Sequence, residues 1–306
     1  MEPTLNPPVI ARPPTSTHAP AAAHAPVQAP AAARLQPPVA PATPAPGAGR
    51  LRRTTQQRWF IALRSFAIFT ALWYAMFVWN GNPLQLPSPA RVVTSLWDLM
   101  ASGEIFEHAL ISTTRLATAL GVAILLAVPL GFWMGRSHAA NAYIDPLVEM
   151  LRPISGIAWL PLGLFIFGVG DTLPVFIMVY VAFFPILLNT IAGVRQVDQK
   201  LIAAASTMGV GRRALLIHVL VPAALPTVMV GIRLAFAASW AAIVAAELIG
   251  SPSGLGFAIE WYRQLLMTPK VFAFILVIGV VGYLCDVALR ALQRYLTPWS
   301  EGTGLQ

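Results

Sequence analysis

The residue types with most chemical potential lie together in one polar interruption of an apolar chain. Residues 201–226, LIAAASTMGVGRRALLIHVLVPAALP, hold two adjacent arginines, a histidine, two glycines and two prolines. Gly209 and Gly211 permit a tight turn with positive φ, and the sequence on both sides favours helices. Pro222 and Pro226 are expected to end the second helix and redirect the chain. The pattern predicts a helix–turn–helix suited to docking another protein. The alternative is a plain loop whose arginines only set the membrane topology.

Other chemistry is not indicated by the sequence. GVGRRA, residues 209–214, matches a dinucleotide-binding fingerprint, but no strand precedes it and no acidic residue follows it in a βαβ unit. The chain also lacks a Walker A sequence for ATP. Its single cysteine, Cys285, excludes an intrachain disulfide, and its five histidines are scattered. We therefore expect no enzyme activity, no metal site and no cofactor bound by this chain.

The composition predicts an all-α polytopic membrane protein. Of the 306 residues, 57% are hydrophobic and only 10% are charged, with a mean hydropathy of +0.69. A bilayer core about 30 Å thick needs around 20 helical residues to cross it. Six stretches meet that length, at about 59–79, 111–135, 147–168, 173–194, 227–249 and 271–293.

The two ends of the chain differ from this membrane domain, which we place at 58–299. Thirteen of the 27 prolines fall within the first 50 residues, among alanines. Such a segment cannot bury enough apolar surface to offset its ordering entropy, so residues 1–57 are predicted to form a disordered tail. Residues 300–306 are a short C-terminal tail, and residues 195–226 form the loop that carries the polar interruption.

The basic residues at the edges of the spans predict the orientation. Twelve lie on the side of the N-terminus, and three on the other side, namely Arg91, Arg263 and Lys270. The excess belongs in the cytoplasm, so both termini and residues 195–226 are expected there. The twelve are Arg50, Arg52, Arg53, Arg58, Arg136, Arg152, Arg195, Lys200, Arg212, Arg213, Arg290 and Arg294.

The third span contains several helix breakers. Pro153 and Pro161 remove backbone donors and clash with the preceding turn, so this helix should be kinked or discontinuous. Broken helices in transporters often line a polar cavity, whereas the alternative is a kink that serves packing. The candidate path residues in this span are Arg152, Pro153, Ser155, Gly156 and Trp159.

Charged groups inside spans are functional candidates because their burial in lipid is costly. Arg115, Glu149 and Glu247 lie close to predicted span ends and favour structural roles. Arg233 and Asp286 either form a structural pair, or Arg233 faces a cavity and attracts an anion. Asn189 in the fourth span is expected to bond between helices more readily than to touch substrate.

Several blocks resemble permeases of ATP-binding cassette (ABC) importers, specifically the nitrate/sulfonate/taurine permease family. The blocks cover about residues 85–299 and include DPLVEMLRPISGIAWLPLGLFIFGVGDT, FFPILLNTIAGVRQVD, VAAELIGSPSGLGF and ALRALQRYLTPW. The polar interruption looks like the EAA loop of that family, with Ala203-Ala204-Ala205 as the triplet, Gly209 as its glycine and Pro222 as its proline. Ala203 stands where the triplet usually has glutamate, and Ser155-Gly156 stands where the family often has Pro-Pro.

The resemblance implies a type I importer permease in a bacterial inner membrane. Such a subunit forms a homodimer, docks ATPase subunits that hold ATP and Mg²⁺, and receives substrate from a soluble binding protein. The loop would couple ATPase closure to alternating access, through Ala203, Ala204, Ala205, Gly209, Gly211, Arg212, Arg213 and Pro222. A small anion, taurine or another sulfonate or nitrate-like, is the expected substrate. An ion-driven secondary transporter and a non-transporting scaffold are the alternatives.

Overall fold

The computed structural model describes residues 49–299, with side chains from residue 60 onward except residue 62. All the regular elements of this range are helices, as the composition predicts. In chain order they are α1 (Gly49–Asn80), α2 (Pro89–Ala101), α3 (Glu104–Arg136), α4 (His138–Leu151), η1 (Gly156–Trp159), α5 (Leu160–Phe167), α6 (Thr172–Arg195), α7 (Gln199–Thr207), α8 (Arg212–Leu215), η2 (Leu216–Leu220), α9 (Val221–Gly250), α10 (Leu255–Gln264) and α11 (Thr268–Leu296).

The chain divides into two units, residues 1–58 and 59–306. The predicted disordered tail falls mostly on residues 1–48, outside the described residues, as do residues 300–306. Residues 49–57, which we expected in the tail, belong to helix α1. The arginines and glutamines of this stretch are good helix formers, whereas all thirteen prolines of the expected tail lie before it.

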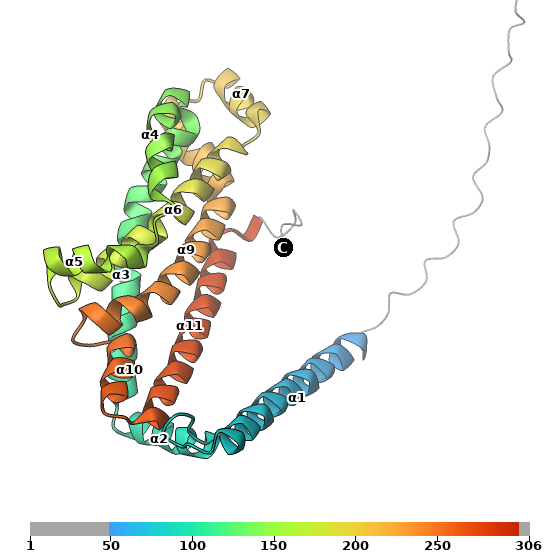
Figure 1. Cartoon of the computed structure of the whole chain (residues 1–306). Coiled ribbons are helices and arrows are strands. Elements are labelled where there is room, and N and C mark those ends of the chain that lie inside the picture. Colours follow the sequence, from blue (N-terminus) through green and yellow to red (C-terminus); the bar gives the residue numbers. More distant parts are fainter. Residues whose placement is uncertain (1–48, 300–306) are drawn as a thin grey trace, which may run out of the picture. The chain divides into compact units, whose positions relative to one another are not determined.

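Within the described range, four helices are long and apolar enough to cross a membrane: α3, α6, the continuous stretch Arg212–Gly250, and α11. The pair α4 and η1–α5 adds a fifth crossing if it counts as one span, and its two halves are bent by 80°. This bend confirms the predicted break in the third span (Figure 1). The remaining expected span, 59–79, is the first in the chain; it lies within α1 and is not among these helices.

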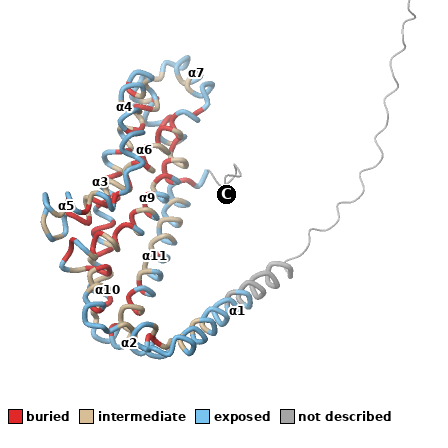
Figure 2. The backbone as a smooth tube through the Cα atoms, viewed as in Figure 1, coloured by how far each residue is buried: buried red, intermediate tan, exposed pale blue. Residues whose placement is uncertain are grey.

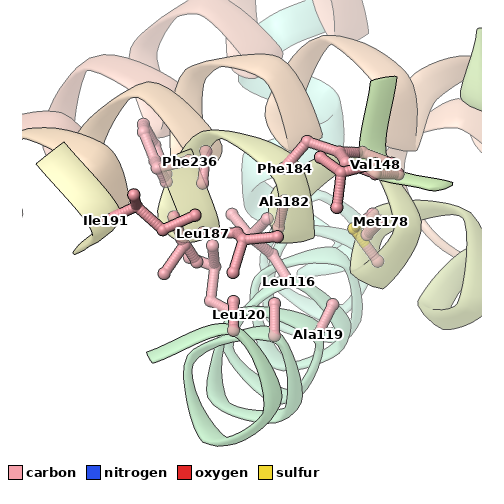
Figure 3. Packing of buried hydrophobic residues seen from close by; sticks show 14 of the residues in the cluster. Leu116, Ala119, Leu120, Val148, Met178, Ala182, Phe184, Leu187, Ile191 and Phe236 are labelled. Carbon is pink, nitrogen blue, oxygen red and sulfur yellow. The ribbon is translucent and has the colours of Figure 1, made fainter. Parts of the chain in front are cut away.

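The core of the second unit is the contact of α6 with α3 on one side and α9 on the other. Leu116, Ala119 and Leu120 of α3 meet Ala182 and Leu187 of α6 in Figure 3. Glycines let the backbones approach closely, as small residues do in membrane helix pairs. A Cβ at Gly131 would lie 2.6 Å from Thr190 Cβ, and one at Gly231 would lie 2.6 Å from Asn189 Cβ.

The two prolines at the end of the polar interruption do not end a helix, contrary to our expectation. Pro222 lies in the first turn of α9 and Pro226 lies inside it. The π-helical turn η2 joins α8 to α9, and the amide of Val221 bonds to Leu216 O, five residues back. Because this wider turn shifts the hydrogen-bond register, the helix accommodates a residue that has no N–H and continues.

The ends of the bundle are built differently. α7 and the start of α4 lie at one end, and α2 and α10 lie at the other (Figure 1). Ser88 caps α2 by accepting a hydrogen bond from the amide of Arg91. Figure 2 shows burial concentrated along α3, α6 and α9, whereas α7 has no buried residue. α7 is thus the least covered element at its end of the bundle.

Candidate functional site

The predicted helix–turn–helix is present as a protruding knob, which we define as residues 199–215. Asp198 caps α7 through the amide of Lys200, at 2.8 Å, and Gly209 ends the helix with φ of +75°. The left-handed conformation at Gly209 reverses the chain, which then begins α8 at Arg212. This confirms the turn that the glycine spacing predicts.

The surface of the knob is small, apolar and positively charged. Ala203 and Ala204 are exposed, Ala205 is partly covered, and Met208 is 80% exposed. Lys200, Arg212 and Arg213 are exposed, and no acidic residue lies between 199 and 215. Such a surface suits a partner with an apolar hollow and an acidic rim.

A cleft of about 570 Å³ lies beside the bend between α4 and η1. Its walls come from the bend itself, from the middle of α6 and from α9. Ile154, Ile157, Phe184 and Leu188 supply apolar surface, and small residues of α9 such as Ala238 leave space.

The cleft brings together four of the predicted path residues: Arg152, Ser155, Gly156 and Asn189. A Cβ at Gly156 would collide with Val181 of α6, so the absence of a side chain lets the bend pack directly on α6. The amide nitrogen of Asn189 donates to Pro185 O at 2.8 Å, within its own helix rather than between helices.

The other predicted path residues do not line the cleft. Pro153 lies in the turn before η1, and Trp159 packs against the ring of Tyr180 with centroids 5.6 Å apart. Arg233 donates from Nε to Asp286 Oδ1 at 3.0 Å, which confirms the structural pair. The alternative role for Arg233, attracting an anion into a cavity, is not supported by this position.

The bend lies at an intermediate depth in the bundle. The Tyr180 hydroxyl donates to Leu151 O at 2.7 Å, and Tyr180 is the ninth residue of the 24-residue helix α6. At 1.5 Å per residue the bend is therefore about 12 Å from the Thr172 end and about 22 Å from the Arg195 end. Arg152 thus lies beside the interior of α6 and not beside either of its ends, whereas our topology count placed it at the edge of a span. Without it the count is eleven against three, and the orientation prediction is unchanged.

A buried ionic network lies near the end of the bundle that carries α10. The Arg115 side chain is 4% exposed, and its Nη1 donates to Glu247 Oε1 at 2.8 Å, where Glu247 is fully buried. Nε of the same guanidinium donates to Asp171 Oδ1 at 3.0 Å, while Nη1 also donates to the carbonyl of Ser253 and Nη2 donates to the Ser253 hydroxyl, both at 2.8 Å. The network ties α3 to α9 and to the loops that precede α6 and α10.

Glu247 also holds the turn into α10. It accepts hydrogen bonds from the Ser112 hydroxyl at 2.8 Å and from the Gly256 amide at 2.9 Å. The Ser112 oxygen in turn accepts from the Leu255 amide at 2.9 Å. Gly254 has φ of +106°, and a Cβ there would strike the Glu247 carboxylate, so this turn requires glycine.

Sequence reasoning noticed Arg115 and Glu247 but assigned them to span ends. α3 begins at Glu104, ahead of the expected 111, so Arg115 lies three turns inside the helix. One signal in the sequence could have predicted this network. Arg115 and Glu247 have opposite charges, and each lies a few residues inside an expected span on the same side of the membrane.

The chain matches the family model described as "Binding-protein-dependent transport system inner membrane component" over residues 127–300. That match covers more than half of the chain, from the second half of α3 through α11. The chain belongs to this family. The resemblance to importer permeases in the sequence is therefore confirmed, and the protein is a multi-pass membrane permease.

Relatives within this permease family extend the match beyond the family model. The taurine transport system permease protein TauC of Escherichia coli is 34% identical over 245 residues, covering 78% of this chain and 89% of the relative. A putative aliphatic sulfonates transport permease protein of Bacillus subtilis is 36% identical, covering 79% and 88%. The bicarbonate transport system permease protein CmpB of Synechococcus elongatus is 35% identical, covering 71% and 82%.

The fold of the permease also matches a solved structure. An inward-facing conformation of the MetNI methionine ABC transporter aligns with a TM-score of 0.51 and 19% identity, over 62% of this chain and 94% of that chain. At this identity the match concerns the fold alone.

Proposed function

We propose that this chain is the membrane subunit of an ATP-driven importer for a small anion. The observation that carries the proposal is the knob: a short helix without buried residues, ended by a left-handed glycine and followed by two exposed arginines. Helix α7 of the knob contributes no buried residue to the packing of its own chain. Its exposed apolar and cationic surface fits a partner that covers it.

The partners of the proposed complex follow from the family and the knob. An ATPase subunit holds ATP and Mg²⁺ and docks on Ala203, Ala204 and Met208, while its acidic side chains pair with Arg212 and Arg213. Ala203 replaces the glutamate of the EAA triplet, so the charge of this contact comes from the basic side. A second copy of the chain completes the translocation path, and a soluble binding protein delivers substrate.

Coupling in this proposal is mechanical. Closure of the ATPase pair on ATP moves the knob as one body, because Gly209 sets a compact turn and α8 continues through η2 into α9. Movement of α9 is transmitted to α6, its main packing partner, and hence to the cleft. The knob and both termini face the cytoplasm, and the chain resides in a bacterial inner membrane.

The names of three relatives support, as the substrate, a small anion or zwitterion that carries a sulfonate or a carbonate group. Taurine, aliphatic sulfonates and bicarbonate are the solutes in the relatives' names. We favour a sulfonate such as taurine.

A secondary transporter driven by an ion gradient has less support. Such transporters use acidic groups inside the membrane to carry protons or cations. Glu247 is paired with Arg115, and Asp286 is paired with Arg233 and Arg290. Both carboxylates are therefore neutralised by arginines.

Copurification and uptake test the proposal. The tagged chain should bring down an ATPase subunit and support ATP-dependent uptake of taurine in vesicles. Gly209→Val should lower uptake about tenfold, because a β-branched residue in the left-handed region costs roughly 1–2 kcal/mol and rebuilds the turn. Gly209→Asn should retain most activity, since asparagine tolerates that conformation.

Gly211→Val provides a matched comparison in the same knob. Gly211 has φ of −63°, and like Gly209 it has open space around a built Cβ. It should lose less uptake than Gly209→Val because its backbone is not strained by a side chain. Equal uptake for wild type and Gly209→Val, with the ATPase still bound, would refute coupling through the turn. Uptake by the chain without any ATPase would refute the proposal as a whole.

A further inference from the structure

Arg152 is a positive charge inside the span region, and it has no counter-charge among the residues whose side chains the structure describes. It lies at the bend, next to Leu151, whose carbonyl accepts from Tyr180, a residue about 12 Å from one end of α6 and about 22 Å from the other at 1.5 Å per residue. It is exposed in the cleft. The carbonyl end of α4 supplies only about half a negative charge there.

Two other arginines within the spans are neutralised by carboxylates. Arg115 has Glu247 and Asp171, and Arg233 has Asp286 at 3.0 Å. Arg152 forms no ion pair and no side-chain hydrogen bond within residues 60–299. A charged group left without a partner at such a depth is expensive, so it indicates a ligand or ion pathway.

The surroundings of Arg152 define what can pair with it. No carboxylate lines the cleft, and the Ser155 hydroxyl has no hydrogen bond to another described residue. The guanidinium and the hydroxyl can donate hydrogen bonds to an oxyanion. The remaining walls, including Ile157, Phe184 and Leu234, are apolar. A volume of about 570 Å³ admits a small solute together with water.

We propose that Arg152, with Ser155, forms a transit site for a small oxyanion on the translocation path. One negative oxyanion group pairs with the guanidinium and accepts from the hydroxyl, while the body of the solute contacts the apolar walls. The site repels cations, and its single charge favours anions without retaining them as tightly as a closed cage would. This inference rests on the proposed function and adds the residue that selects for charge.

Cysteine labelling tests the charge of the site on the whole chain in lipid nanodiscs, without ATPase or binding protein. The native thiol is removed by Cys285→Ala, and Ser155→Cys places a thiol in the cleft. The thiolate attacks a methanethiosulfonate, forms a mixed disulfide and releases methanesulfinate. The two probes are anionic sulfonatoethyl methanethiosulfonate and cationic trimethylammonioethyl methanethiosulfonate.

With Arg152 present, the ratio of anionic to cationic labelling rates should exceed that of free cysteine by about tenfold, as expected for one charge a few ångströms away in partly hydrated protein. Arg152→Gln should abolish this excess and Arg152→Lys should keep most of it. Arg233→Gln, which removes a paired arginine outside the cleft, should leave it in place. Ethanesulfonate should slow labelling, and the neutral ethyl methyl sulfone should not.

The proposal is overturned by a labelling ratio equal to that of free cysteine, by an excess that survives Arg152→Gln, or by a thiol that neither probe reaches. Ile157→Cys, on the same cleft wall, repeats the measurement if Ser155→Cys does not fold. These results are independent of ATPase copurification. An importer that assembles but shows no charge preference loses the transit site alone, whereas a charge preference without any ATPase partner contradicts only the proposed coupling.

Discussion

Substitution of Glu247 by glutamine isolates the charge in the buried network. The change keeps the shape of the side chain but removes the negative charge that faces Arg115, whose Nη1 lies 2.8 Å from Glu247 Oε1. Glu247 is fully buried and Arg115 is 4% exposed, so water cannot replace the lost partner. Asp171 remains, but its side chain is 77% exposed and screened by solvent.

The expected cost follows from these contacts. Removing one partner of a buried ion pair destabilises a protein by about 3–5 kcal/mol. The glutamine amide also meets a donor on one side: if its oxygen faces Arg115, its NH₂ faces the Gly256 amide, which now donates to Glu247 at 2.9 Å. An unsatisfied buried donor costs about 1–3 kcal/mol, and this loss is part of the total rather than an addition to it.

Unfolding in mixed micelles, followed by tryptophan fluorescence, measures this cost. Glu260→Gln is the matched control, because Glu260 accepts from Arg263 at 2.7 Å in a pair whose arginine is well exposed. Exposed pairs contribute about 0–1 kcal/mol, so the control should unfold almost as the wild type does. The double variant Arg115→Gln/Glu247→Gln removes both charges and should cost less than the sum of the single changes.

A loss for Glu247→Gln no larger than that for Glu260→Gln would refute the reasoning, since it would mean that water reaches the pair. A double variant that costs the full sum would show that hydrogen bonds, and not the uncompensated charge, dominate the network.

Two further predictions concern packing and pH. Gly131→Val should destabilise the fold by about 1–3 kcal/mol, because its Cβ would lie 2.6 Å from Thr190 Cβ between α3 and α6. Gly121→Ala, on the same helix, has open space around the new Cβ and should not destabilise the fold. Equal free energies of unfolding for the two variants would contradict the close contact. On α10, outside the spans, hydrogen bonds from Arg263 and then Gln264 lower the pKa of Glu260 from 4.5 to about 2. The stability from this lowered pKa is fully present above pH 4.5 and is lost as the pH falls through about 2. The small difference in free energy of unfolding between wild type and Glu260→Gln should therefore disappear in that window, and a difference that stays constant with pH would contradict the assignment.

Local features of the sequence were sufficient to predict several of the individual elements. Helical spans follow from apolar length, since a backbone in lipid must bond within itself. The turn of the knob follows from Gly209, because glycine adopts positive φ without steric cost. The break in the third span follows from its prolines and from Ser155-Gly156, which disfavour one continuous helix. Each of these depends on neighbours in the chain.

The tertiary structure decided which distant residues meet. Glu247 lies 132 positions from Arg115, and only the packing of α3 against α9 brings them to 2.8 Å, so sequence reasoning left both at span ends. The position of Arg152 along α6 depends on the contact between the bend and Tyr180. The helix continues past Pro222 because the π-helical turn η2 shifts the hydrogen-bond register before it. Contacts of this kind arise from the positions of whole helices, which hydropathy and turn residues do not specify.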